Sequence, residues 1–252
     1  MEISLQGKNI LVTGASRGIG AAIAQQLGKS GARVAVHYGR NAEKAQEVAN
    51  AAGNGAQVFR ADLNNDAACQ QLFADVIAAF GRVDVLVNNA GIAIQSSLDA
   101  THEQWVQDWN QTMQVNLTAT AILSRLAIIH FQQGSGGRLI HIASRAAFRG
   151  DTADYMGYAA SKAGMVALSR SIARAYGKQG ITSFVIAPGF TATEMAQDFI
   201  DEYGMEYAMQ GVALDRLTKP TDLAPTIVLL ASGLSDHATG CTIDMNAGSY
   251  VH

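Results

Sequence analysis

Cysteine is scarce and histidine is scattered in this sequence. The two cysteines, Cys69 and Cys241, lie far apart in apolar or small-residue surroundings and form no C-x-x-C pair, so we expect buried free thiols. None of the six histidines shows H-E-x-x-H or a similar ligand spacing. The sequence therefore predicts no metal site.

Charged residues and long apolar runs are also few. Charged residues make up 15% of the chain, the net charge is -3, and no long lysine or arginine run occurs. These features argue against a nucleic-acid partner and favour a small molecule. The N-terminal residues lack a signal-peptide pattern, and no uninterrupted apolar run approaches the length of a membrane span. We therefore expect a soluble, cytoplasmic protein with no membrane partner.

Linker sequences are missing as well. The three prolines are Pro188, Pro220 and Pro225, and no Ser/Pro-rich or single-charge segment divides the chain. Nearly half of the residues (48%) are hydrophobic, enough to bury a sizeable core. Residues 1–252 are predicted to form a single domain.

What the chain does contain is an alternation of short β-branched runs with longer Ala-rich stretches. This pattern is typical of repeated βαβ units and predicts an α/β fold with a parallel sheet covered on both faces. The first helix is expected from Arg17 to Gly31. The irregular stretch 189–218 is a candidate for a mobile substrate lid. The predicted strands are Asn9–Val12, Arg33–His37, Gln57–Arg60, Val83–Val87, Arg138–Ile142, Thr182–Ile186 and Thr242–Asp244.

A glycine-rich turn, TGASRGIG, follows the first predicted strand at Thr13 to Gly20 and opens the first helix. Glycine lets the backbone approach a pyrophosphate closely, and the helix N-terminus favours its negative charge. Such turns also occur as ordinary tight turns. The position between a strand and a helix favours a dinucleotide site.

The end of the second strand indicates which dinucleotide is bound. A carboxylate at this point favours NAD, and a cation accommodates the extra phosphate of NADP. The stretch His37 to Asn41 contains no acid, whereas Arg17 and Arg40 could supply cations. We therefore predict NADP, with NAD possible; the alternative is that both arginines are solvated surface residues.

Tyr158 and Lys162 lie four residues apart, on one face of a predicted helix. Tyrosine has a pKa near 10 and needs a nearby positive charge to act as an acid or base at neutral pH. By itself this spacing is common on helix surfaces. Here an apolar strand precedes it and ends at Ser144, whose hydroxyl could orient a substrate oxygen.

These motifs together resemble the short-chain dehydrogenase/reductase family, and the similarity covers essentially the whole chain. The resemblance is carried by the glycine-rich turn, Asp62 after strand three, Asn88-Asn89-Ala90-Gly91, Asn116 in VNLT, Ser144, Tyr158, Lys162 and the Pro188-Gly189-x-x-x-Thr193 segment. It implies a Rossmann-type three-layer sandwich with a seven-stranded parallel sheet.

The resemblance also implies residue roles. The catalytic residues would be Asn116, Ser144, Tyr158 and Lys162: Tyr158 would protonate the carbonyl oxygen, Lys162 would lower its pKa and hold the nicotinamide ribose, and Asn116 would support a proton relay through water. Asp62 would lie near the adenine, and Thr193 would meet the carboxamide. Taken singly, Asp62 could instead cap a helix, Asn89 could occupy a turn, and Asn116 could satisfy buried backbone. The cofactor residues it implies are Gly14, Ser16, Arg17, Gly18, Ile19, Gly20, Tyr38, Arg40, Asp62, Leu63, Asn89, Ala90, Gly91, Tyr158, Lys162, Pro188, Gly189, Thr191 and Thr193.

Several positions depart from the family pattern. One extra residue stands between Ser144 and Tyr158, in the loop that would border the substrate. Arg145 and Arg149 in that loop are interpreted as solvated or salt-bridged, with an acidic substrate group as the alternative partner. Thr191 replaces the usual aliphatic residue, and Ala247 stands where glycine is frequent.

The expected function is hydride transfer between NADP(H) and a small carbonyl or alcohol substrate, by a ketone reductase or secondary-alcohol dehydrogenase. A 3-oxoacyl-acyl-carrier-protein reductase is the first alternative, for which we expect a basic patch at the site entrance. The second is a catalytically silent dinucleotide-binding sensor, which would not need an intact Ser, Tyr and Lys. The resemblance further implies a homo-oligomer, commonly a tetramer, and the tail 244–252 is a candidate to reach a neighbouring subunit.

Overall fold

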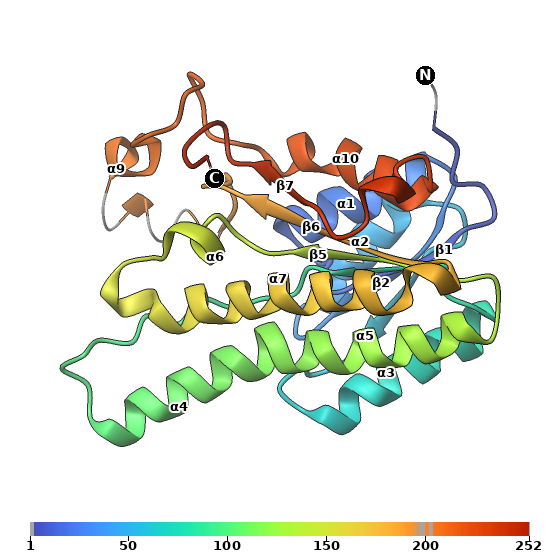
Figure 1. The fold of residues 1–252 in the computed structure, drawn as a ribbon, viewed down its shortest axis with the longest axis horizontal. Coiled ribbons are helices and arrows are strands. Elements are labelled where there is room, and N and C mark those ends of the chain that lie inside the picture. The colour runs from blue at the N-terminus through green and yellow to red at the C-terminus, as the bar shows by residue number, and fades with distance from the viewer. Residues whose placement is uncertain (1–2, 195, 197–199, 202–203, 252) are drawn as a thin grey trace.

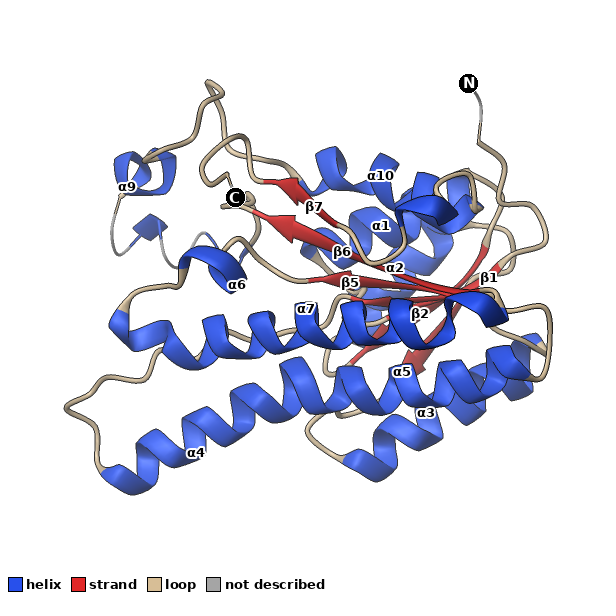
Figure 2. Ribbon diagram, in the orientation of Figure 1, coloured by secondary structure: helices blue, strands red, loops and turns tan. Residues whose placement is uncertain are grey.

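The computed structural model describes residues 3–194, 196, 200–201 and 204–251. One sheet lies between two layers of helices (Figures 1 and 2). The strands are β1 (Asn9–Val12), β2 (Arg33–Tyr38), β3 (Gln57–Arg60), β4 (Val85–Asn88), β5 (Gly137–Ile142), β6 (Ile181–Pro188) and β7 (Thr242–Met245). The helices are α1 (Gly18–Lys29), α2 (Ala42–Ala52), α3 (Asp66–Phe80), α4 (His102–Met113), α5 (Ala119–Gln132), α6 (Ala146–Arg149), α7 (Met156–Tyr176), α9 (Met205–Met209) and α10 (Pro220–Ser232). Shorter turns are the π-helical η1 (Gln114–Thr118) and the 3-10 turns η2 (Ala153–Tyr155), η3 (Gly177–Gln179) and η4 (Asp236–Ala238).

The sheet confirms the predicted fold class. Its seven strands run in the order β3-β2-β1-β4-β5-β6-β7, and every neighbouring pair is parallel. Successive side chains of a strand point to opposite faces, so Ile10 and Val12 pack with α1 and α10 while Leu11 packs with α3 and α5. Both faces are apolar because helices cover both.

The strand order reverses between β1 and β4, which lie side by side although two strands separate them in the chain. In open α/β sheets, ligands bind outside the carboxyl ends of the strands at such a reversal. The glycine-rich turn leaves β1 at this point, and the Asn89–Gly91 turn leaves β4. The topology therefore brings the two predicted cofactor turns together.

The predicted strands agree with the observed ones to within two residues at each end. The largest differences are β4, predicted as Val83–Val87, and β6, predicted as Thr182–Ile186. Strand β6 continues because Ala187 and Pro188 pair with β7. Proline has no N–H to donate, and Pro188 contributes its carbonyl, which accepts from the Arg145 amide (2.9 Å).

A continuous helical segment of 31 residues, His102–Gln132, is long and apolar enough to pass a test for a membrane span. Its most apolar stretch is 44% buried inside the protein. Leu123, Ala127 and Phe131 from this segment pack in the core beneath the sheet. Core packing thus accounts for the apolar character of the helix.

Ala247 has a φ of +52°, in the left-handed region that favours glycine. A left-handed conformation costs an L-residue about 1–2 kcal/mol, and glycine in the unfolded chain offsets roughly half of this. We expect Ala247→Gly to raise the free energy of unfolding by about 0.5 kcal/mol and Ala247→Val to lower it. Urea unfolding of both variants measures this, and a less stable Gly variant would contradict the strain.

Candidate active site

The four predicted catalytic residues come from three segments at the carboxyl edge of the sheet. Ser144 follows β5, Tyr158 and Lys162 lie on α7, and Asn116 lies in the π-helical turn η1 between α4 and α5. Figure 1 shows α7 and the α4–α5 segment running side by side along one face of the sheet. A π-turn inside a helix is rare and frequently marks a functional site.

The Tyr158 and Ser144 hydroxyls lie close enough for hydrogen bonding by Ser144 to lower the pKa of the phenol. Burial raises the pKa of the Tyr158 phenol to about 12, opposed by the hydrogen bond with Ser144 and assisted by the negative charge of Asp151. The phenol is therefore protonated at neutral pH. Ser144 Oγ also accepts a hydrogen bond from the amide of Ala146 (3.1 Å), which holds this hydroxyl beside Tyr158.

Lys162 is only 3% exposed. Its ammonium donates to the carbonyl oxygen of Ile142 (2.8 Å) and lies 5.7 Å from the centre of the Tyr158 ring. Desolvation lowers the pKa of Lys162 to about 8. The one-turn spacing thus places a buried cation next to the phenol, as expected for residues that share a helix face.

Asn116 is fully buried, and its side chain fastens the loop after β4. Its Oδ1 accepts from the amide of Ile92 (2.8 Å), while its Nδ2 donates to the Ile92 carbonyl (2.9 Å) and to Ser161 Oγ (3.0 Å). These bonds use the side chain to satisfy buried backbone, the alternative noted for this residue. A water in a proton relay through Asn116 would therefore have to bind a side chain whose Oδ1 and Nδ2 already make these three hydrogen bonds.

The glycines of the first turn allow close approach of two loops. A Cβ on Gly14 would lie 2.8 Å from Cα of Ala90, and one on Gly20 would lie 2.4 Å from Nδ2 of Asn89. Asn89 in turn donates to the carbonyls of Thr13 (2.8 Å) and Gly14 (3.1 Å). Any larger residue at either glycine would push the two loops apart.

His37 also positions this turn, a role that the sequence did not indicate. The Gly14 amide donates to His37 Nδ1 (3.0 Å), which makes Nδ1 an acceptor, so Nε2 donates to the carbonyl of Ala61 (3.2 Å). Burial lowers the pKa of His37 to about 4 and keeps it neutral. A histidine within a predicted strand gives no sign of such a contact.

The N-terminus of α1 fits a dinucleotide pyrophosphate. Among the described residues, no side chain caps the first turn of α1, which is also true of α5, α6 and α7, whereas Asn41, Asn65 and Thr101 cap α2, α3 and α4. Uncapped first-turn amides can bind an anion and are helped by the helix dipole. Glycine at positions 14 and 18, both with positive φ, leaves the backbone open to such a ligand.

Arg17 and the residues after β2 lie at the adenosine end of this site. Arg17 does not stand alone as a solvated cation: its guanidinium pairs with Glu194 (2.6 Å), which also binds Lys44 (2.6 Å). Hydrogen bonds from Lys44 and Arg17 hold the pKa of Glu194 below its ordinary value. Arg40 is exposed.

Asp62 is exposed after β3 and accepts a hydrogen bond from the Asn64 amide (3.0 Å). It does not cap the following helix, because Asn65 Oδ1 takes that role by accepting from Ala68 (3.0 Å). The helix-capping alternative for Asp62 is therefore wrong. Leu63 beside it is buried.

The segment after β6 turns back over the glycine-rich turn. Gly189 packs against Asn246, and the Thr191 hydroxyl donates to the Gly189 carbonyl (3.1 Å). Cγ2 of Thr193 lies 3.4 Å from where a Cβ on Gly18 would be. The predicted lid 189–218 includes residues 195, 197–199 and 202–203, which lie outside the described residues, as does His252 of the predicted intersubunit tail.

The loop before Tyr158 contains the short helix α6 and the 3-10 turn η2. Arg145 is 7% exposed, with its guanidinium 5.5 Å from the centre of the Phe190 ring, a cation–π distance. The interpretation of Arg145 as a solvated residue is therefore wrong. Arg149 is exposed.

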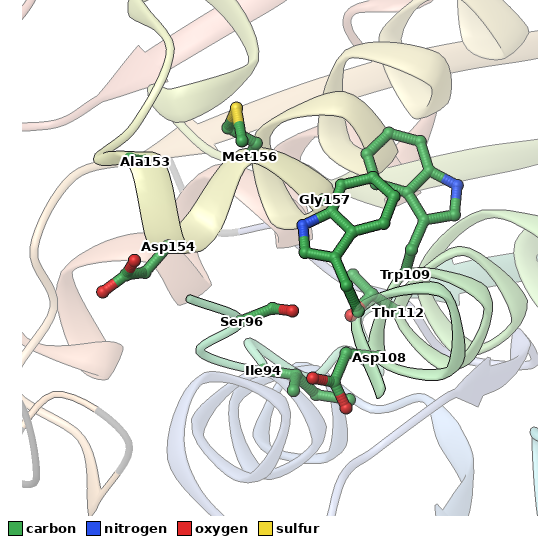
Figure 3. Close-up of a pocket in the computed structure, with 10 residues that line it drawn as sticks. Ile94, Ser96, Asp108, Trp109, Thr112, Ala153, Asp154, Met156 and Gly157 are labelled. Atoms are coloured by element: carbon green, nitrogen blue, oxygen red, sulfur yellow. The ribbon is translucent and has the colours of Figure 1, made fainter. Parts of the chain in front are cut away.

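A small cavity of about 10 Å³ borders the start of α7 (Figure 3). Trp109 and Thr112 of α4 enclose it from one side and Gly157 from the other. A cavity of this size holds at most about one water. It is a gap in the packing between α4 and α7 and too small for a substrate.

A family model and the sequences of known proteins identify the same family. The model of the short chain dehydrogenase family matches residues 8–204. A 3-oxoacyl-[acyl-carrier-protein] reductase FabG of Staphylococcus aureus is 35% identical over 247 residues, covering 97% of this chain and 98% of that protein. Its namesake from Vibrio cholerae is 34% identical over 249 residues, covering 99% and 100%.

Solved structures give the same result. The chain is similar to a dehydrogenase/reductase from Sinorhizobium meliloti, with a TM-score of 0.92, 36% identity, and coverage of 99% of this chain and 98% of the other. It is also similar to a short chain dehydrogenase from Burkholderia cenocepacia in complex with NADP, with a TM-score of 0.89, 36% identity, and coverage of 97% and 98%.

Proposed function

The chain belongs to the short-chain dehydrogenase family, and we propose on this basis that it is an NADP(H)-dependent oxidoreductase that reduces a ketone or oxidises the corresponding secondary alcohol. The observation that carries the proposal is the pairing of the Tyr158 and Ser144 hydroxyls beside the buried ammonium of Lys162. When bound, the nicotinamide supplies or accepts the hydride.

In the direction of reduction, the protein's own residues orient and protonate the substrate. The hydroxyls of Ser144 and Tyr158 hold the carbonyl oxygen between them, and Tyr158 gives its proton to that oxygen as negative charge develops there. Lys162, fixed by the Ile142 carbonyl, stabilises the resulting phenolate. Because its pKa is about 12, the phenol holds its proton at neutral pH, but this value does not show the lowering expected from Lys162. Fast proton transfer would therefore need the phenol to become more acidic once cofactor and substrate are bound.

The cofactor would lie across the reversal between β1 and β4. The uncapped amides of α1 would bind its pyrophosphate, and Gly91, a Cβ on which would lie 3.2 Å from Lys162 Nζ, leaves space for the ribose beside that lysine. Arg17 and Arg40 would donate hydrogen bonds to the 2′-phosphate that distinguishes NADP from NAD.

We expect NADPH to be preferred over NADH by about tenfold in KM, since a charge-assisted phosphate contact is lost with NADH. The test is a set of initial rates with both reduced cofactors and a panel of ketones, keto acids, sugars and acyl thioesters, followed through absorbance of the nicotinamide. A clear preference for NADH would contradict the NADP assignment. No turnover of any C=O substrate would contradict the reductase proposal.

A 3-oxoacyl-acyl-carrier-protein reductase is the second candidate. It is supported by relatives of that name that are 33–35% identical over nearly the whole chain. Turnover of acetoacetyl thioesters well above that of small ketones would favour this candidate. The reverse result would favour a small-metabolite ketone reductase.

We also propose a homo-tetramer of single-domain subunits that works in the cytoplasm. One sheet joins strands from Asn9 to Met245, which supports the single domain. Cys69 and Cys241 are free thiols, which suits a reducing compartment; Cys69 is buried as expected, whereas Cys241 is only half-buried. Light scattering that gives a monomeric mass at working concentration would rule out the tetramer.

A further inference from the structure

The carboxylate of Glu194 links two cations that the sequence places far from it. Its Oε2 accepts from Arg17 Nη1 and its Oε1 accepts from Lys44 Nζ, each at 2.6 Å. Arg17 ends the glycine-rich turn, and Lys44 lies in the first turn of α2. The Glu194 carboxylate therefore bridges the two cations, with one oxygen bound to each.

The position of these cations suits a different anion. Helix α2 follows β2, the strand whose end meets the adenosine ribose in dinucleotide-binding folds. The Asn41 side chain caps the start of α2 by accepting from the Lys44 amide (2.9 Å), which fixes the backbone from which the lysine extends. Arg17 stands opposite, at the N-terminus of α1. The two cations therefore converge on one point, which the Glu194 carboxylate occupies.

We propose that Lys44 forms the 2′-phosphate site together with Arg17, and that the Glu194 carboxylate occupies this site until NADP(H) displaces it. The inference rests on the proposed function and extends it, because it assigns a further specificity residue and a competing internal anion. A carboxylate and a phosphate both present oxygen acceptors to guanidinium and ammonium groups, and the phosphate carries more charge.

Exposure makes the exchange easy. The side chains of Arg17, Glu194 and Lys44 are 62%, 54% and 45% exposed, so water screens both ion pairs and each is weak. A phosphate dianion that brings more charge and more acceptors can therefore take over both cations. NAD(H), which lacks this phosphate, would leave Glu194 in place.

The exchange would also reach the substrate side of the site. Glu194 directly follows Thr193, whose methyl group packs near Gly18 in the glycine-rich turn. Release of Glu194 would free this segment from its attachment to Arg17. Binding at the adenosine end would thus be linked to the segment that the family assigns to the nicotinamide carboxamide.

The first test measures equilibrium binding of two fragments by titration calorimetry: adenosine 2′,5′-bisphosphate, which carries the 2′-phosphate, and adenosine 5′-monophosphate, which lacks it. We expect Glu194→Gln to bind the bisphosphate about fivefold more tightly and the monophosphate unchanged. Glu103→Gln is the matched control, because it removes an exposed carboxylate at the start of α4. Unchanged or weaker binding of the bisphosphate by Glu194→Gln would overturn the competing role of Glu194.

The second test addresses Lys44. We expect Lys44→Gln to weaken bisphosphate binding about tenfold with little effect on the monophosphate, and the Glu194→Gln gain to shrink in the double variant because the two residues share one site. Equal bisphosphate affinity in Lys44→Gln and wild type would exclude Lys44 from the site. Failure of the wild-type protein to bind NADPH or NADH would instead reject the proposed function.

Discussion

Tyr158→Phe is expected to lower kcat roughly a hundredfold to ten-thousandfold while NADPH still binds. The substitution removes only the phenolic oxygen, which in the proposed mechanism gives its proton to the substrate, and general acid catalysis by a positioned group contributes roughly 10²–10⁴-fold. Loss of the hydrogen bond with Ser144 should change the free energy of unfolding by about 1 kcal/mol or less. Steady-state rates, NADPH titration and urea unfolding together measure the three effects.

Tyr176→Phe provides the matched control. It makes the same chemical change at the last residue of α7, roughly 27 Å along the helix from Tyr158 at the usual rise per residue. We expect wild-type turnover from this variant. Wild-type turnover in Tyr158→Phe, or an equal loss in Tyr176→Phe, would overturn the assignment of Tyr158 as the proton donor.

The sheet was predictable because its signals are local. Each strand candidate is a short apolar run of its own, and burial on both faces removes any need for a polar alternation. The ends were less predictable, since they depend on partners distant in the sequence. Strand β6 reaches Pro188 only because β7 offers Asp244 and Met245 beside it.

The site residues also divide into those that local sequence predicts and those that it does not. Tyr158 and Lys162 were predictable because one helical turn separates them, and Ser144 because it follows a buried strand at its carboxyl end. His37 and Glu194 were not, since their partners are joined to them only by the fold. Long-range contacts of this kind leave no trace in residue spacing.

Arg145 shows where spacing misleads. An arginine in a polar loop is usually solvated, but the turn of β5 into α6 points this one into the protein, where Phe190 lies against its guanidinium. Its amide also donates to the Pro188 carbonyl (2.9 Å), which ties the Ser144 loop to the end of β6. The loop that follows Ser144 is therefore attached to the segment that borders the cofactor.

Lys162→Met is expected to lower kcat at least about a hundredfold and, at neutral pH, to stabilise the fold. The activity falls because the charge beside Tyr158 is lost. Stability rises because a folded-state pKa of about 8, against 10.5 for the ordinary lysine, means that burial penalises the ammonium by up to about 3 kcal/mol. Replacing a buried charged residue that serves the function commonly raises stability while it lowers activity.

The sign of the pH dependence follows from proton binding. Below pH 8 Lys162 is charged in both states and the full penalty acts; between about pH 8 and 10.5 only the unfolded chain keeps the proton, so wild-type stability gains on rising pH. The advantage of Lys162→Met should therefore be largest near pH 7 and shrink towards pH 10. Lys178→Met, at an exposed lysine after α7, serves as the control that keeps wild-type turnover. Urea unfolding at both pH values decides the point, because a Met variant that is less stable than wild type at pH 7 would show that the bond from Lys162 to Ile142 outweighs the cost of burying the charge.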